Sequence, residues 1–127
     1  MKHKLLTLFA VAASFLGIGG LLFAHHAAAA YSNGETITVQ GTTTEFQFVN
    51  PHVLIHWDVK DEKGEVQQWQ GELTSPNHLV RAGWNRTSIK RGDQIAVTGY
   101  RSKNGSNSLR ITKVVVNGQP LSTTQGE

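Results

Sequence analysis

The sequence has 127 residues and no internal repeat, which is the length of one small domain with little else. It contains no cysteine, so a disulfide framework and a CxxC-type site are excluded. The formal charge of +3 falls to +1 without Lys2 and Lys4, because ten basic side chains then face nine acidic ones. A chain this close to neutrality is a poor general binder of polyanions.

The first part of the chain is typical of a secretory signal. Lys2 and Lys4 give it a positive start, and residues 5–24 are apolar or small and carry no charge. About twenty apolar residues are also long enough to span a bilayer, but three glycines between residues 17 and 20 weaken a permanent membrane helix. We therefore expect cleavage and a periplasmic or otherwise exported protein, with membrane contact only through an uncleaved segment.

The point of cleavage decides the chemistry of the mature N-terminus. Cleavage after Ala30 follows three alanines, discards His25 and His26, and is what the local sequence favours. Cleavage after Ala24 makes His25 the first residue, so that its amine and its imidazole chelate a metal, with His26 as a further imidazole. Nitrogen ligands of this kind suit Cu(II), Ni(II) or Zn(II). Residues 25–35 then form a flexible N-terminal arm.

The first strand is expected to begin at Thr36 and to change its buried face near Gly41. Apolar side chains occupy odd positions at first, as at Ile37, and even positions later, as at Phe46. Such a change predicts a bulge or a sharp bend in the strand. Asn50-Pro51 then interrupts the strand and turns the chain.

Residues 49–73 predict two strands joined by a tight turn. Apolar and polar side chains alternate along residues 53–59, the period of a half-buried strand. Gly64 suits the left-handed position of a three-residue turn, and this turn sets Trp57 opposite Trp69 on the buried face. The outer face of this hairpin is then polar and carries His52, His56, Asp58, Gln68, Gln70 and Glu72.

A short helix follows the hairpin. A capping serine and a proline begin the segment from Ser75 to Gly83, and the glycine ends it. Leu79 and Val80 are expected to plug one end of a barrel, with Trp84 in the core or as a lid.

Two more strands and a tail complete the chain. Residues 94–100 and 109–116 alternate as strands around a hairpin loop centred on Asn104-Gly105, and residues 119–127 form a polar tail that we expect to fray. Three strands, a short helix and two strands are the order of the OB-fold, a five-stranded Greek-key barrel. The sequence therefore predicts a mainly β, OB-fold-like domain at residues 36–118, with a short helix between strands 3 and 4, after an N-terminal signal peptide.

Several short motifs carry a resemblance to a known family. They are Ala24-His25-His26, Asn50-Pro51-His52-Val53, Glu72-Leu73-Thr74-Ser75-Pro76-Asn77, Gly83-Trp84 and Gly92-Asp93. With them the chain resembles a family of small, exported, functionally uncharacterised bacterial proteins, over almost all of the mature sequence. The resemblance implies cleavage after Ala24, although Ala27 replaces the family's serine and Arg91 its common proline. A more distant similarity, to periplasmic OB-fold proteins, implies binding of ligands or partners.

The histidines make a copper or zinc site one hypothesis. His52 and His56 share a strand face, but four residues of strand separate their Cα atoms by ~13 Å, and nitrogen ligands lie about 2 Å from a metal. A folded-over N-terminal arm would close this gap. The candidate ligands are His25, His26, His52, His56 and Glu72. The alternative is that both strand histidines are structural, with His52 bonded to a backbone carbonyl.

A metal-free binding module is the second hypothesis. OB-folds commonly bind through the outer face of strands 2 and 3 and through the loops beside it. The candidate residues here are Asp58, Gln68, Gln70, Tyr100, Arg101 and Lys103. Only Tyr100 is placed to stack on a base, and the protein is expected to be exported, so we expect no nucleic acid and instead an envelope protein, a glycan or a lipid headgroup.

Catalysis is the least supported reading. Serine and threonine residues lie mostly in turns, without a placed histidine and carboxylate. Asp58 and Glu72 are the only candidates for acid–base work, and carboxylates on an outer strand face are usually only solvated. We expect a non-enzymatic binding protein.

Overall fold

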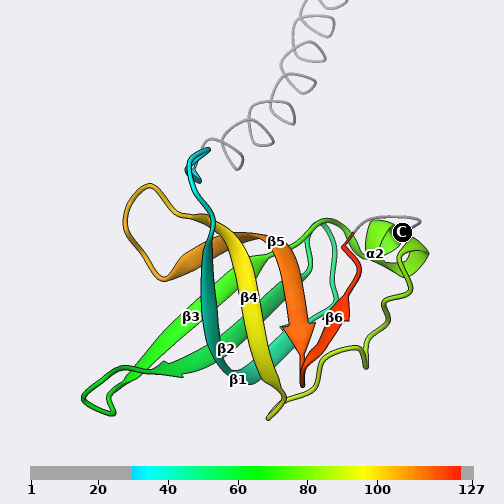
Figure 1. Cartoon of the computed structure of the whole chain (residues 1–127). Helices are drawn as coiled ribbons and strands as arrows, with labels where there is room; N and C mark the ends of the chain where they lie inside the picture. Colours follow the sequence, from blue (N-terminus) through cyan, green and yellow to red (C-terminus); the bar gives the residue numbers. More distant parts are fainter. Residues whose placement is uncertain (1–29, 124–127) are drawn as a thin grey trace, which may run out of the picture. The chain divides into compact units, whose positions relative to one another are not determined.

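The computed structural model describes residues 30–123, which form a closed five-stranded barrel with one short helix and a short extra strand (Figure 1). The elements in chain order are β1 (Ile37–Gln47), β2 (Leu54–Lys60), β3 (Val66–Glu72), α2 (Pro76–Arg81), β4 (Gln94–Arg101), β5 (Ser108–Val116) and β6 (Gln119–Leu121). The strand order is β3-β2-β1-β4-β5-β6, and a parallel pairing of β3 with β5 closes the barrel. The predicted OB-fold is confirmed.

Strand β1 serves both halves of the barrel. Its first half pairs with β4 and its second half with β2, and the register with β2 shifts between Thr43 and Glu45. The predicted change of buried face therefore occurs at this bulge, a few residues beyond Gly41. Gly41 has another role, since a Cβ atom there would lie 2.2 Å from the carbonyl oxygen of Asp58. It lets β1 pass close to β2.

The hairpin of β2 and β3 has the register that its turn predicts. Trp57 pairs with Trp69, and Ile55 pairs with Gly71. Gly64 adopts a left-handed φ of 78° in the turn. The rings of Trp57 and Trp69 stack with their centroids 6.2 Å apart, although only Trp57 is fully buried. This fixes which side chains of β2 and β3 face outward.

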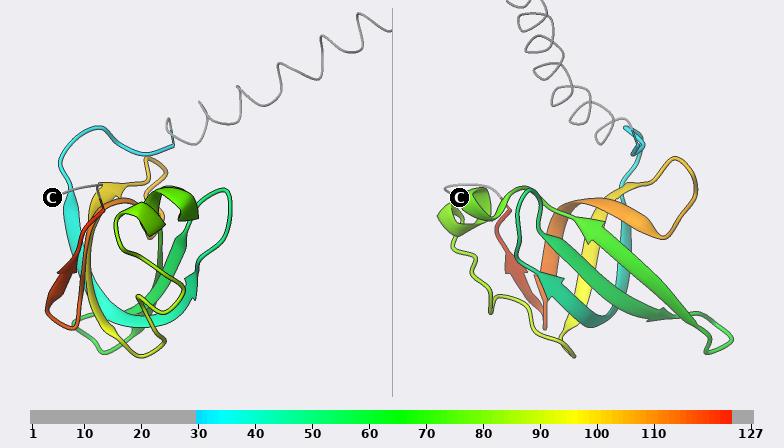
Figure 2. Two further views of the ribbon diagram at one scale, coloured as in Figure 1. Left: turned by 90° about the vertical axis from the view of Figure 1, so that its right-hand side faces the viewer. Right: turned by 180° about the vertical axis from the view of Figure 1, so that it is seen from behind.

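The helix covers one end of the barrel, as Figure 2 shows from two sides. Leu79 is fully buried and Trp84 is 3% exposed, but Val80 is 55% exposed. Burial of Val80 was therefore a wrong prediction, because a helix of six residues turns only one face to the barrel. Trp84 is a core residue that packs on Phe46, and its indole N–H donates to the carbonyl oxygen of Ser122 at 2.5 Å.

The polar tail begins later than its composition indicates. Asn117 and Gly118 both have positive φ and form a tight turn after β5. The chain then returns along β5 as β6, with Leu121 opposite Val114. Residues 119–121 are thus a strand, and residues 124–127 lie outside the described part. Among residues 30–123, no helix is long and apolar enough to cross a membrane.

Candidate functional site

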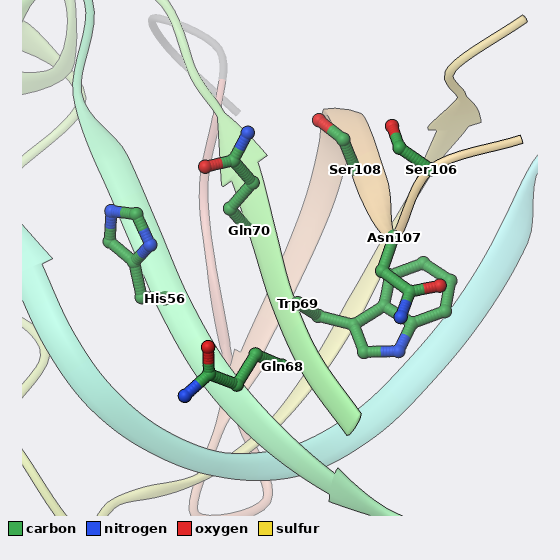
Figure 3. Close-up of a pocket in the computed structure, with 7 residues that line it drawn as sticks. All are labelled: His56, Gln68, Trp69, Gln70, Ser106, Asn107 and Ser108. Atoms are coloured by element: carbon green, nitrogen blue, oxygen red, sulfur yellow. The ribbon is translucent and has the colours of Figure 1, made fainter. Parts of the chain in front are cut away.

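A cleft opens on the barrel where β3 separates from β5. The two strands pair only along Gln70, Gly71 and Glu72 of β3, so the first half of β3 has no strand on this side. The resulting cleft has a volume of about 400 Å³. Its lining comes from β2, β3, the loop between β4 and β5 and the first residue of β5 (Figure 3): His56, Gln68, Trp69, Gln70, Ser106, Asn107 and Ser108.

Arg101, at the end of β4, holds the loop that forms one wall of the cleft. Its guanidinium donates to the carbonyl oxygens of Gly105 at 3.0 Å and Ser106 at 3.3 Å. The same group lies over the ring of Trp69, 5.3 Å from the ring centroid. Trp69 thus contacts Arg101 as well as Trp57. Its ring braces the loop and is not a free platform for stacking a ligand.

Asn107 ties the loop to β3. Its carbonyl oxygen accepts a hydrogen bond from the backbone N–H of Gln70 at 3.1 Å. Its side-chain amide donates to the side-chain oxygen of Gln67 at 3.5 Å. The next residue, Ser108, is buried, and its hydroxyl lies 3.3 Å from the hydroxyl of Tyr31. Both ends of this wall are therefore fixed by contacts made within residues 30–123.

The lining offers hydrogen-bonding groups and little charge. Gln68 and Gln70 extend on the same side of β3 as His56 of β2, whereas Trp69 points toward Asn107 (Figure 3). No carboxylate, lysine or arginine is among the lining side chains. Within the described residues, the Nε2 atom of His56 is buried and has no hydrogen-bond partner. A buried ring nitrogen of this kind is costly to leave unpaired.

The metal-ligand candidates within residues 30–123, His52, His56 and Glu72, do not form a three-ligand site. His52 and Glu72 meet through Nδ1 and Oε1, so His52 contacts this carboxylate. His56 lies opposite Gln70 in the register of β2 with β3, and not opposite Glu72. No group of three or more histidines or carboxylates able to hold a metal is found within residues 30–123. His25 and His26 lie outside the described residues.

The partner-binding candidates are also divided. Gln68 and Gln70 line the cleft, and Asp58 lies opposite Gln68 in the hairpin. Tyr100 is covered by Arg110, whose guanidinium carbon is 4.6 Å from the ring centroid. The other two candidates, Arg101 and Lys103, are exposed at the end of β4 and in the loop after it.

The cleft also includes three residues, two in the β4–β5 loop and one at the start of β5, that were not predicted as site residues. Ser106, Asn107 and Ser108 follow the Asn104-Gly105 turn and were read only as a hairpin connection. The signal that could have found them is their position in the chain, because the loop between strands 4 and 5 is a common binding element of OB-folds.

Comparison with known proteins gives a family and a fold. The Family of unknown function (DUF6152) matches residues 14–110, about three quarters of the chain. No curated protein matches the sequence. Among solved structures, the mitochondrial single-stranded DNA binding protein Rim1 from S. cerevisiae is similar, with a TM-score of 0.50 and 9% identity over 67% of this chain and 95% of that one. A small single-stranded DNA-binding protein from Streptomyces coelicolor has a TM-score of 0.43 and 12% identity over 67% and 93% of the two chains.

These comparisons correct one expectation from the sequence. Nucleic acid was excluded as a partner, and that exclusion is wrong, because a single-stranded DNA-binding protein is built on the same barrel. The exclusion relied on the lack of stacking aromatics and on export. At 9% identity the similarity itself shows the fold alone.

Proposed function

The chain belongs to the family of unknown function DUF6152, and we propose that it is an exported, non-enzymatic OB-fold protein that binds a neutral, hydrogen-bonding partner. The observation that carries the proposal is the cleft between β3 and the β4–β5 loop. It lies on the outer face and loop that OB-folds commonly use for binding. Its volume of about 400 Å³ is within the range of ligand sites in general.

The chemistry of the lining selects the class of partner. The side chains of Gln68 and Gln70 each present both a donor and an acceptor, and Ser106 adds a hydroxyl, while the side-chain amide of Asn107 is already shared with Gln67 and Arg101. Such a set suits a partner whose own donors and acceptors alternate, as in a peptide main chain or a glycan. The nearest guanidinium, that of Arg101, is occupied by its own loop. An anionic lipid headgroup is therefore the less suitable envelope partner.

The same lining favours binding over catalysis. The cleft holds one imidazole, on His56, but no carboxylate to orient it. Of its two serine hydroxyls, that of Ser108 is buried against Tyr31. A nucleophile with an oriented base is the usual requirement for covalent catalysis.

The experiment is an NMR titration of the ¹⁵N-labelled protein, expressed untagged from the complete sequence. The probes are a capped neutral peptide, a neutral oligosaccharide, inorganic phosphate and a short oligo-dT. We expect a neutral probe to shift the side-chain amide signals of Gln68, Gln70 and Asn107. Shifts given only by phosphate or oligo-dT, and abolished by salt, would overturn the proposal.

Two glutamine variants provide the matched pair for this titration. Gln70→Ala removes a lining amide. It should lower the affinity for the neutral probe by about tenfold, the effect of losing one or two hydrogen bonds. Gln40 is an exposed glutamine on β1, outside the cleft lining. Gln40→Ala should leave the affinity within about twofold.

A second candidate, divalent metal binding, is favoured by the contact of His52 with Glu72. This pair supplies one imidazole and one carboxylate, to which His25 and His26 would add nitrogen ligands of the kind that copper or zinc takes. The test is calorimetric titration of the untagged protein with Cu(II) and Zn(II). We expect the double variant His25→Ala/His26→Ala to lose binding, and undiminished affinity in that variant would rule the site out.

A further inference from the structure

Strand β3 presents an open edge beside the cleft, and its main-chain groups can be assigned by parity. The N–H of Leu73 donates to the carbonyl oxygen of Val53 at 2.8 Å, and the N–H of Asp61 donates to that of Glu65 at 2.9 Å. No register shift interrupts the pairing of β2 with β3. Odd-numbered residues of β3 therefore direct their main-chain groups toward β2, and even-numbered residues direct theirs away from it.

Two of these even-numbered residues have no strand beside them. The N–H of Gln70 is taken by the carbonyl oxygen of Asn107, and β5 begins opposite Gln70. Within residues 30–123, no strand pairs with Val66 or Gln68 on this side. Their N–H and C=O groups are open along the edge that continues into the cleft. In the views of Figures 1 and 2, this part of β3 runs out from the barrel with β2.

The edge also lacks the usual protection against pairing. Exposed sheet edges normally carry charges, a proline or a bulge that prevents another chain from adding to them. Residues 66–70 are Val-Gln-Gln-Trp-Gln, without a charge or a proline, and their pairing with β2 has no bulge. Val66 is one of two large apolar side chains within residues 30–123 that are more than half exposed.

We propose that the partner is an extended polypeptide segment that adds to this edge as a further strand, beside Val66 and Gln68. The inference rests on the proposed function, because the added strand would run into the cleft. Main-chain hydrogen bonds to the two open residues supply the affinity, and alternate side chains of the segment meet the amides of Gln68 and Gln70. The strand occupies the place that β5 would take if β5 began earlier.

The charge next to the edge indicates what flanks the added strand. The end of β2 and the hairpin turn before Val66 carry four carboxylates and two ammonium groups, and so are net negative: Asp58, Lys60, Asp61, Glu62, Lys63 and Glu65. An uncharged segment that runs antiparallel to β3 and is followed by a lysine or an arginine complements this charge, because its C-terminal end then lies beside this turn. A second copy of this chain would bring an identical acidic turn, so a different polypeptide is the better partner.

The test uses a capped peptide of alternating threonine and valine, six residues long and followed by two lysines. Amide hydrogen exchange is measured by NMR on the untagged, ¹⁵N-labelled protein. In the free protein we expect fast exchange at Val66 and Gln68 and slow exchange at Gln67 and Trp69. Saturating peptide should slow the first two by about tenfold or more, as a new main-chain hydrogen bond would.

A proline variant isolates the main-chain contact from the side chains. Val66→Pro removes an N–H that faces away from β2, so no hydrogen bond to β2 is lost, and an edge strand tolerates proline at such a position. It should lower the affinity for the peptide by about tenfold. Val66→Thr keeps the N–H and a branched side chain, and should lower this affinity by less than about threefold. If Val66→Pro does not fold, the exchange experiment on the unaltered protein still decides.

The outcomes separate this inference from the proposed function. Shifts at Gln70 and Asn107 with no added protection at Val66 and Gln68 would overturn strand addition and leave the cleft as the site. No response to the peptide or to a neutral oligosaccharide would overturn both. Self-association that Val66→Pro abolishes, measured by light scattering, would assign the edge to a second copy and overturn the choice of partner.

Discussion

The guanidinium of Arg101 lies over the ring of Trp69, 5.3 Å from its centroid, and joins the β4–β5 loop to the middle of β3. The same guanidinium donates to two carbonyl oxygens of that loop. The side chain of Arg101 therefore sets the position of the β4–β5 loop, which is one wall of the cleft, relative to β3. The open edge of β3 begins at this level, because the loop meets β3 at Gln70 and leaves Gln68 without a strand partner on the side of β5.

Arg101→Ala should loosen the loop and lower the stability of the barrel. A cation–π contact at an exposed site and the hydrogen bonds of the guanidinium together contribute about 1–2 kcal/mol. We expect the free energy of unfolding in urea to fall by that amount, with a change in Trp69 fluorescence. Lys103→Ala changes a charge in the same loop and should alter stability by less than about 0.5 kcal/mol. Equal losses in both variants would contradict the structural role of Arg101.

Leu79→Ala and Val80→Ala test which face of α2 packs on the barrel. Leu79 is fully buried, so its truncation leaves a cavity and should cost about 2–5 kcal/mol. Val80 is 55% exposed, and alanine is a better helix former, so Val80→Ala should stay within about 0.5 kcal/mol of the unaltered protein. Urea unfolding measures both. A large loss in Val80→Ala would show that this side chain is covered.

The register of the central hairpin followed from the sequence because two local signals agree. Gly64 fixes a three-residue turn, and the alternation of residues 53–59 fixes the buried face, so a slip of one residue would bury amides. The face change of β1 was also predictable as a feature, but not at Thr43, since the bulge position depends on how β1 divides its pairing between β2 and β4.

The cleft could not be predicted in the same way. Its opening depends on where β5 begins relative to β3, and that is set by the contacts of Arg101 with Trp69 and of Asn107 with Gln70, which join residues distant in the sequence. The lining amides Gln68 and Gln70 were found because they lie on a strand face. Strand β6 was missed because its signal, Asn117-Gly118, also reads as the end of a strand.

Gly41→Ala tests the close passage of β1 over β2. A Cβ atom at this position would lie 2.2 Å from the carbonyl oxygen of Asp58, so one of the two strands has to move. We expect a loss of about 1–3 kcal/mol, the range for overpacking. Gly34→Ala is the matched control, because nothing lies within 4 Å of a Cβ atom there. Similar urea midpoints for both variants would contradict the close contact.

The carboxylate of Asp93 makes the stability of the turn before β4 depend on pH. One oxygen accepts a hydrogen bond from the N–H of Lys90 at 2.8 Å, and the other accepts one from the side-chain amide of Asn117 at 3.1 Å. The bond from Lys90, then that from Asn117, hold the pKa of Asp93 below its ordinary value. The charged form is thus favoured in the folded state.

Because its pKa is lower in the folded state, ionised Asp93 stabilises the protein at pH values above its unfolded-state pKa, which is about 4. The contribution is lost as pH falls through the lower, folded value. Asp93→Asn keeps one acceptor oxygen but turns an amide donor toward one of the two donors, so it should be the less stable protein at pH 7. The difference should shrink as pH falls below about 4, because Asp93 is protonated first in the unfolded state and then, at its lower pKa, in the folded state. Thermal unfolding of both proteins from pH 7 to pH 2 measures this, and a difference that stays constant over the range would show that the charge of Asp93 plays no part.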